Sequence, residues 1–473
     1  MESAMSDRTD TSISQLRAAL HGRVIAPGDP GYDEARTVFY GGIDRRPAVI
    51  ARVADAADVA HVVGVARDTG LQLAVRSGGH SVAGHSVCEG GIVLDLSDMR
   101  ALDIDAEEHT AWAEPGLTAG EYSTAAAALG LATGFGDSGS VGIGGITVGG
   151  GVGFLVRKHG LTIDDLLAAD VVIADGRLLR ADAETHPDLF WAIRGGGGNF
   201  GVVTRFRFRL HDLDPFVGGM LFLPATPGSI QSFVAAAEAA PEELSAIANV
   251  MTAPPMPFLP VEHHGRPLIM AVMAYAGPTD AGERALAPFR AIAEPVADMV
   301  RPMPYPEIYL PEEEGYHPIS TVRTMFVDAV DGSDAETIVE HLQAGAAPMR
   351  VAQLRVLGGA MARVPEDATA FAHRRRRIMV TVAAVYERLD EAEEHGAWVD
   401  GFAAALRRDA GAYVNFLGYE GDARVREAYP GPTWDRLTAI KARYDPTNMF
   451  RLNQNIPPAV DGPGHRETPV SKA

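Results

Sequence analysis

The sequence predicts an α+β fold in two domains, the second of which is an antiparallel sheet backed by helices. A strand–helix–strand pattern leads into a glycine-rich loop at residues 75–81. The run Leu213-Asp214-Pro215-Phe216 marks a change, because the chain beyond it is richer in proline and poorer in glycine. From there to about residue 440, strands alternate with alanine-rich helices, an order typical of a sheet covered on one side. We therefore expect domains at 1–213 and 214–440, followed by a C-terminal segment, 441–473.

Length, charge and cysteine content narrow the class of protein. A chain of 473 residues can form two or three domains with cores of their own. Its net charge of −21 repels polyanions and argues against nucleic-acid and membrane partners. The single cysteine, Cys88, excludes a disulfide framework and a multi-cysteine metal site, and it reads as a small buried apolar residue. Residues 1–15 are polar, and no apolar run of membrane-spanning length follows, so we expect a soluble cytoplasmic protein with a loose N-terminal tail and no metal.

The elements of the first domain follow from caps and periodicity. Apolar residues at helical spacing predict a helix over 56–69, with Asp55 as its N-cap and Gly70 just beyond its end. Strands are expected at 71–75 and 92–96, and helices at 118–129 and 187–193. Between residues 205 and 210 arginine alternates with phenylalanine or leucine, which predicts a strand with one basic and one apolar face.

The loop Arg76-Ser77-Gly78-Gly79-His80-Ser81 is the first candidate for chemistry. Adjacent glycines let the backbone approach a ligand and expose N–H groups that cradle phosphate oxygens. Arg76 adds positive charge and His80 adds a nucleophilic nitrogen. Taken alone, the loop is equally compatible with an ordinary glycine turn that carries a surface histidine.

Two further glycine-rich regions, 134–153 and 194–201, do not predict a Rossmann domain. The pattern that starts at Gly142 lacks its third glycine, because residue 147 is threonine. The pattern Gly196-x-Gly198-x-x-Gly201 is complete, but a helix precedes it and a strand follows it, the reverse of the required order.

The second domain is expected to contain strands at 218–223, 268–275, 350–357 and 377–386, and helices at 229–239, 280–292, 334–344 and 391–408. In the last helix Trp398, Phe402 and Leu406 form a stripe that predicts core packing. The basic run 374–377 reads as a solvated strand entry. Residues 444–456 are rich in turn-forming and amide side chains, and the last sixteen residues read as disordered.

Four motifs in order, RSGGHS with GGIVLDL, VGIGGITVGGGVGFLVRKHGL, DLFWAIRGGGGNFGVVT and YDPTNMFRLNQNI, together resemble the FAD-linked oxidases of the vanillyl-alcohol-oxidase superfamily, in its berberine-bridge-enzyme-like branch. The resemblance covers roughly residues 35–458. It implies an FAD-binding domain at 1–213, a substrate-binding domain at 214–440, and a C-terminal segment that returns to the FAD-binding domain before its disordered tail.

In that family the first loop holds the FAD pyrophosphate, and its histidine, matched here by His80, is bonded to the flavin 8α-methyl carbon. Many relatives add a second bond from a cysteine, where this chain has Ser138, so the resemblance implies FAD held covalently by His80 alone. The residues that match cofactor-binding positions are Arg76, Ser77, Gly78, Gly79, His80, Ser81, Gly84, Ser138, Val141, Gly142, Gly144, Gly145, Gly201, Val202, Asn453 and Asn455.

The resemblance also implies the reaction, hydride transfer from an alcohol, hemiacetal or amine carbon of a small molecule to flavin N5. Val141 matches the residue that leaves room for oxygen beside the flavin, which implies O2 as acceptor and H2O2 as product. Gln353 and Arg355 match positions of polar catalytic groups on a strand of the second domain. A tyrosine that serves many relatives as base is replaced by Phe416.

Because of that replacement, three sources of the missing base remain open. Tyr413 acts instead, Arg355 lowers the pKa of a neighbouring tyrosine, or the substrate is an amine that needs no strong base. The structural alternatives are a sheet-face ion pair for Arg355 and a packed ring for Tyr413. Two other functions also remain open: a flavin dehydrogenase with a different electron acceptor, and a flavoprotein without catalysis. The chain is expected to be a monomer or a homodimer.

Overall fold

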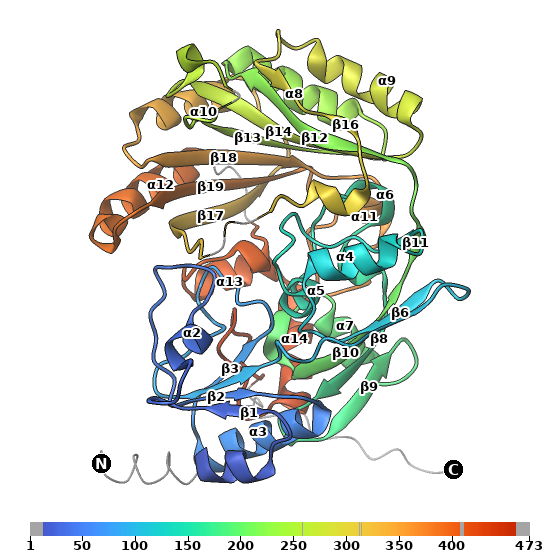
Figure 1. Ribbon diagram of the computed structural model, residues 1–473, viewed down its shortest axis with the longest axis vertical. Helices are drawn as coiled ribbons and strands as arrows, with labels where there is room; N and C mark the ends of the chain where they lie inside the picture. Colours follow the sequence, from blue (N-terminus) through green and yellow to red (C-terminus); the bar gives the residue numbers. More distant parts are fainter. Residues whose placement is uncertain (1–12, 258, 312, 314, 407–410, 460–473) are drawn as a thin grey trace, which may run out of the picture.

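The computed structural model describes residues 13–257, 259–311, 313, 315–406 and 411–459. The elements form two halves stacked along the long axis of the molecule (Figure 1). Residues 13–19 are helical and Leu16 is fully buried, so the expected loose tail does not extend to residue 15. Disorder was expected for the last sixteen residues, 458–473. Residues 460–473 lie outside the described residues, but the Ala459 backbone N–H donates to the Thr438 carbonyl oxygen at 2.9 Å, so the chain is still placed at residue 459.

A small sheet with the order β1-β2-β4-β3 holds the first glycine loop. Its strands are β1 (Arg23–Ile25), β2 (Val49–Arg52), β3 (Leu73–Arg76) and β4 (Ile92–Asp95), and β4 runs parallel to both β2 and β3. Helix α3 (Ala56–Thr69) begins where the Asp55 side chain accepts two backbone N–H bonds, and it ends at Gly70 with φ 73°. Both predicted caps are therefore confirmed, and the loop leaves the end of β3.

A second sheet has the order β5-β6-β10-β8-β9. Its strands are β5 (Leu102–Asp105), β6 (Thr110–Ala113), β8 (Leu166–Val172), β9 (Leu178–Asp182) and β10 (Val202–Arg209). In β10 the side chains of Phe206 and Phe208 are fully buried while Arg209 is exposed, as the alternation predicts. Other elements of this half are α2 (Tyr32–Arg36), α4 (Ala119–Ala127), β7 (Leu131–Ala132), α5 (Ile143–Gly149), α6 (Val156–His159), α7 (Pro187–Ile193) and β11 (His211–Asp212), and the C-terminal helices join them.

The other half is built on an antiparallel sheet with the order β15-β12-β14-β13-β18-β19-β17, where β16 also pairs with β12. The strands are β12 (Phe216–Pro224), β13 (Leu244–Thr252), β14 (Pro267–Ala276), β15 (Ala297–Asp298), β16 (Arg301–Pro302), β17 (Ile319–Val327), β18 (Met349–Val356) and β19 (Ile378–Tyr386). Helices α8 (Pro227–Ala239), α9 (Thr279–Arg290), α10 (Gly332–Ala344) and α12 (Ala392–Leu406) lie on its outer face, and α11 (Ala360–Arg363) follows β18 (Figure 1). The prediction of a sheet covered on one side is confirmed.

The long strands β13 and β17 were not predicted. All but the last residue of β13 is buried, so both faces of this strand are covered and its sequence shows no apolar–polar alternation. The helix that was expected at 391–408 is α12, and the stripe along it packs as predicted: Phe402 is fully buried and Leu406 is 4% exposed.

The two faces of the large sheet have different partners. Along β18, Ala352, Leu354 and Val356 belong to the core beneath the helices. Gln353 and Arg355 alternate with them and therefore lie on the opposite face, toward the glycine-rich half.

After α12 the chain returns to the first half. Helix α13 (Asp422–Ala428) precedes α14 (Pro432–Tyr444), and α14 packs beside α7. From α14 the buried Lys441 ammonium donates to the carbonyl oxygen of Asn199 at 2.7 Å and pairs with Asp445 at 2.6 Å. The boundary expected after residue 440 falls inside this helix.

The basic run 374–377 was predicted to be solvated, and that prediction is wrong for its first residue. The Arg374 side chain is fully buried and donates to both carboxylate oxygens of Asp164, at 2.7 and 2.8 Å. Its neighbour Arg375 is 81% exposed. Consecutive side chains at the entry to β19 therefore point in different directions, which a run of like residues does not reveal.

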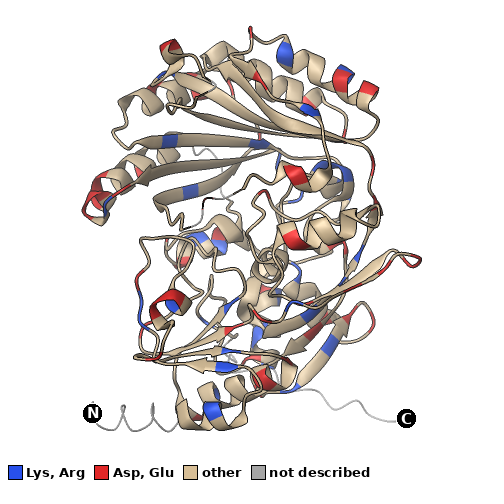
Figure 2. Ribbon diagram, in the orientation of Figure 1, with Lys and Arg blue, Asp and Glu red and all other residues tan. Residues whose placement is uncertain are grey.

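Charged side chains occur over both halves, with acidic groups prominent on α9 and α12 (Figure 2). Cys88 is 1% exposed, as expected, and burial raises the pKa of its thiol to about 11. In the described part of the chain, no helix combines the length and apolar character that crossing a bilayer requires.

Candidate active site

A cavity of about 510 Å³ lies where the glycine loops meet the C-terminal segments 413–417 and 450–454. We call it the first cavity. Its walls bring together most of the residues predicted to bind cofactor, although they come from distant parts of the chain. These residues are Ser77, Gly78, Gly79, His80, Ser81, Ser138, Val141, Gly142, Gly144, Gly145, Gly201, Val202 and Asn453, joined by Tyr413.

Arg76 does not line this cavity, contrary to the expectation that it adds charge beside a phosphate. Its guanidinium is buried and binds the Asp95 carboxylate at 2.7 Å, because β3 and β4 place the two residues side by side. No lysine or arginine lines the cavity among the residues that the structure describes. Any phosphate held here would therefore depend on backbone N–H groups and on hydroxyl, amide and imidazole side chains.

Two more predicted cofactor residues also lie outside the lining. Gly84, at φ 71°, packs against Ile43, which an added Cβ would approach to 2.9 Å. The Asn455 side-chain oxygen is buried and has no hydrogen-bond partner within the described part of the chain, and Asn455 is not among the residues that line the first cavity. Asn453 does line it, and its buried Oδ1 likewise lacks a partner among the described residues.

The imidazole of His80 contacts side chains of two other segments. It stacks on the ring of Phe39 with the ring centroids 4.1 Å apart. Its Nε2 lies 2.9 Å from Ser140 Oγ, and Ser140 Oγ is 3.1 Å from Ser138 Oγ. The ring is therefore held from two sides at the wall of the first cavity.

Glycine is required where the first loop meets the start of α5. A Cβ at Gly78 would lie 2.3 Å from the backbone nitrogen of Gly142, so the two backbones can approach only without side chains. Gly145 and Gly198 differ, because a Cβ on either would meet nothing within 4 Å and both residues line the first cavity. The missing side chains leave room for a flat ligand such as a flavin against this wall. The glycine walls, the hydroxyl groups and the unpartnered Asn453 oxygen together fit FAD.

Tyr413 is buried at the edge of the first cavity. Its hydroxyl oxygen accepts hydrogen bonds from the backbone N–H of Gly151 at 2.9 Å and of Val152 at 3.3 Å, and from Asn415 Nδ2 at 3.0 Å. Burial raises the pKa of Tyr413, while these donors and the nearby Arg355 charge lower it by less. The hydroxyl therefore stays protonated near neutral pH and ties the 413–415 segment to the end of α5.

Arg355 forms an ion pair on the face of the sheet, the structural alternative considered for it. The Arg355 side chain is 2% exposed, pairs with the Asp137 carboxylate, and donates to the Val152 carbonyl oxygen at 3.0 Å. It also donates to Gln353 Oε1 at 3.1 Å, and Gln353 Nε2 donates to Asn249 Oδ1 at 2.9 Å. The Arg355 guanidinium lies 5.7 Å from the ring centroid of Phe416. Neither Gln353 nor Arg355 lines the first cavity.

Gln353 instead lines a second cavity, of about 380 Å³. This cavity lies between the uncovered face of the large sheet and the segment 299–311. The two cavities share Asp137 and Ser138 in their walls. The two cavities therefore adjoin at these two residues.

Sequence reasoning missed Phe39, His85, Asp137, Ser140 and Asn415, all of which line or contact the first cavity. Ser140 and Asp137 stand in the glycine-rich stretch 134–153, which was a detectable signal. Burial lowers the pKa of His85 to about 4, so its ring is neutral at physiological pH. Phe39 and Asn415 carried no local signal.

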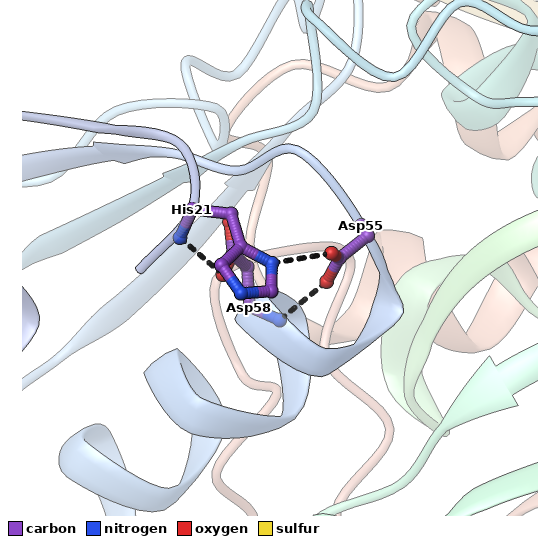
Figure 3. Close-up of side chains that lie close together, drawn as sticks. All are labelled: His21, Asp55 and Asp58. Carbon is purple, nitrogen blue, oxygen red and sulfur yellow. Dashed lines mark hydrogen bonds and ion pairs between the residues drawn. The ribbon is translucent and has the colours of Figure 1, made fainter. Parts of the chain in front are cut away.

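Among the residues that the structure describes, one cluster of metal-ligating residue types occurs, and it lies away from both cavities (Figure 3). Asp55 caps α3 and also contacts His21 Nδ1 at 2.8 Å. Asp58 accepts from the backbone nitrogens of His21 and Gly22 at 2.9 Å and of Ala54 at 3.0 Å. Its carboxylates thus secure a helix start and the adjoining chain.

The comparisons with known proteins agree with this geometry. Residues 47–182 match the family model described as FAD binding domain, and residues 412–457 match the one described as Berberine and berberine like. The chain is 31% identical to (R)-6-hydroxynicotine oxidase of Paenarthrobacter nicotinovorans, over 96% of this chain and 99% of that protein. It is 30% identical to the xylooligosaccharide oxidase of Thermothelomyces thermophilus, over 88% and 89%.

Among solved structures, 6-hydroxy-D-nicotine oxidase from Arthrobacter nicotinovorans matches with a TM-score of 0.84 and 29% identity. That match covers 93% of this chain and 98% of the other. The predicted fold is confirmed. This chain belongs to the berberine-bridge-enzyme-like family of FAD-linked oxidoreductases.

Proposed function

We propose that this protein is an oxidase that holds FAD by one covalent bond at His80. In this proposal FAD, when bound, accepts a hydride from an alcohol, hemiacetal or amine carbon of a small molecule and passes the electrons to O2, giving H2O2. The observation that carries the proposal is the position of His80. Its imidazole stands at the wall of the first cavity, held between the Phe39 ring and the Ser140 hydroxyl.

Two observations support a single covalent bond. Ser138 lines the first cavity at the position where relatives have a second attachment, and a hydroxyl cannot form a thioether. Cys88, the only cysteine in the chain, is buried in the core beside β4 and does not line the cavity. Because burial raises the pKa of its thiol to about 11, Cys88 carries little of the nucleophilic thiolate at neutral pH.

The side chains around the first cavity have separable roles in this proposal. Backbone and hydroxyl groups of residues 77–81 would hold the pyrophosphate, and Asn453 would offer its unpartnered Oδ1 to a donor of the cofactor. Tyr413 would fix the wall through residues 151 and 152. The raised pKa of its phenol disfavours a role as base.

Val141 supports O2 as the electron acceptor. It is half-buried, lines the first cavity just before α5, and has a smaller side chain than leucine. Oxygen uptake during turnover tests this part of the proposal. A dehydrogenase would instead reduce a dye readily and oxygen poorly.

Acid precipitation tests the covalent bond directly. The purified protein is precipitated, the pellet is washed, and flavin absorbance is recorded in pellet and supernatant before peptide mass mapping. We expect the flavin in the pellet, on the peptide that contains His80. In the His80→Ala variant we expect flavin in the supernatant and a lower turnover rate. Wild-type flavin that is entirely released by acid would contradict covalent attachment.

A further inference from the structure

We propose that the second cavity binds the body of the substrate, and that the substrate is a neutral alcohol with an apolar body. This inference rests on the proposed oxidase function and names its substrate class. The alternatives within that function are oligosaccharides and amines, and the walls of the cavity discriminate among the three.

The floor of the second cavity is an apolar row across the large sheet. Met220, Val272 and Ile247 stand on adjacent strands in direct register, and all three line the cavity. Two more methionines, Met299 and Met303, come from the segment opposite. Methionine side chains are flexible and polarisable and pack well against apolar groups and aromatic rings. This surface therefore fits a hydrocarbon body.

The charged groups of the cavity are already paired. The guanidinium of Arg301 lies 3.3 Å from a carboxylate oxygen of Glu307. The carboxylate of Asp137 is paired with Arg355 of β18. An amine would enter as a cation at neutral pH, and the described walls offer it no carboxylate that lacks a cationic partner. A neutral molecule meets no such penalty.

The side-chain amide groups in the floor of the second cavity already form hydrogen bonds within the protein. Gln353 donates to Asn249 and accepts from Arg355, and Asn249 Nδ2 donates to the Met270 carbonyl oxygen at 3.1 Å. An oligosaccharide would bury many hydroxyl groups against methionine, valine and isoleucine, where they would lose their hydrogen bonds to water. A sugar body is therefore a poor fit for this cavity.

One polar position remains suited to a single hydroxyl. Asp137 lines both cavities, and its side chain is 30% exposed. A substrate hydroxyl that donates to this carboxylate would place the carbon that carries it at the junction with the first cavity. As hydride leaves that carbon, the hydroxyl proton would pass to the Asp137 carboxylate, which would act in place of the tyrosine base that Phe416 replaces. The apolar body would then extend over Met220 and Val272.

The test uses the flavin-loaded enzyme and three probes: 3-phenylpropan-1-ol, 3-phenylpropan-1-amine and xylobiose. Each is mixed with the enzyme without oxygen, and the bleaching of flavin absorbance is followed. We expect the alcohol to bleach the flavin at least tenfold faster, at equal concentration, than either other probe. Faster bleaching by the amine or by xylobiose would overturn the inference. The inference would also be overturned if dithionite bleaches the flavin but none of the three probes bleaches it.

A binding measurement that needs no turnover tests the location. The methyl ether of 3-phenylpropan-1-ol keeps the body but has no hydroxyl to oxidise, and calorimetry reports its affinity. In Met220→Trp the indole should fill the cavity and weaken ether binding at least tenfold. Met349→Trp is the matched control, because Met349 lies on the same sheet face but outside the cavity lining, and it should change binding less than twofold.

If Met220→Trp does not fold, Met299→Trp makes the same test from the solvent side, where the native methionine is 40% exposed. Unchanged ether affinity in a folded variant with a filled cavity would overturn the location. A separate measurement, the flavin content after acid precipitation, tests the proposed oxidase function on which this inference rests. A protein that carries no flavin in either acid fraction would overturn the proposed oxidase itself, and this inference with it.

Discussion

The imidazole of His80 lies nearly parallel to the ring of Phe39, with an angle of 20° between the ring planes and centroids 4.1 Å apart. The two residues come from different segments, since Phe39 follows α2 and His80 follows β3. With Ser140 Oγ at 2.9 Å from Nε2, the imidazole is restrained in both position and rotation. Because the ring is already restrained, its nitrogen loses less conformational entropy when it forms the bond to the flavin.

Ser140→Ala should therefore slow covalent attachment of the flavin. Loss of a hydrogen bond worth about 1 kcal/mol corresponds to roughly a fivefold slower attachment step. The measurement is the time course of acid-stable flavin after FAD is added to protein prepared without it. Ser140→Thr keeps a hydroxyl and should restore most of the rate. Equal rates in Ser140→Ala and the wild type would argue against a positioning role for the hydroxyl.

Ser138→Cys should gain a second covalent bond to the flavin. Ser138 Oγ lies 3.1 Å from Ser140 Oγ, which itself contacts His80, so a thiol at residue 138 would stand close to the attachment point. Peptide mass mapping should find one flavin joined to two peptides, one with His80 and one with the new cysteine. Ser97→Cys, which lies outside the cavity lining, should leave the flavin on the His80 peptide alone. A single-peptide adduct in Ser138→Cys would contradict the prediction.

Arg374→Met should destabilise the fold by about 3–5 kcal/mol, the usual cost of removing one partner from a buried ion pair. The Asp164 carboxylate is only 10% exposed and would lose both hydrogen bonds from Arg374. Urea unfolding measures the effect. Arg375→Met is the matched control, because Arg375 is 81% exposed and its nearest carboxylate oxygen is 3.9 Å away, so we expect a change below about 0.5 kcal/mol. Equal losses in both variants would contradict the assignment.

Stability should fall as the pH drops below about 6.5, in part because of His373. Burial, and to a lesser degree Arg376, lowers the pKa of His373 to about 4, and its residue is 7% exposed. Between these two pH values the unfolded chain binds a proton that the folded chain does not, so stability rises with pH across this window. The full contribution is about 3 kcal/mol, since one pKa unit corresponds to about 1.4 kcal/mol.

Thermal unfolding from pH 4 to 7 checks this. His373→Gln removes the titrating ring and should flatten the slope below pH 6.5 relative to the wild type. His61→Gln is the control, because His61 is exposed and its ring is in water in both states, and it should leave the slope unchanged. A wild-type slope retained by His373→Gln would rule His373 out as its source.

The secondary structure was largely readable because its signals are local. Asp55 and Gly70 mark the ends of α3 through the hydrogen bonds and backbone angles of their own neighbourhoods. The alternation in β10 records one buried and one open face. Where both faces are buried, as in β13, the alternation vanishes, and the strand escaped prediction.

The sequence by itself determined which family the chain resembles, where its glycine loops lie, and that residue 138 offers a hydroxyl instead of a thiol. Those features reside in residue identity and spacing. Only the tertiary structure decided what each side chain contacts. It turned Arg76 away from the first cavity toward Asp95, and it joined Arg355 to Asp137, which is 218 residues away in the chain.

The physical reason is that an ion pair or a ring stack depends on the packing of elements that are remote in sequence. Arg374 and Arg375 are the same residue type in adjacent positions, yet one is fully buried and the other is 81% exposed. Phe39 meets His80 only because the segment after α2 packs against the loop after β3. Residue spacing indicated the chemistry that these groups can perform, and packing selected the partners with which they can perform it.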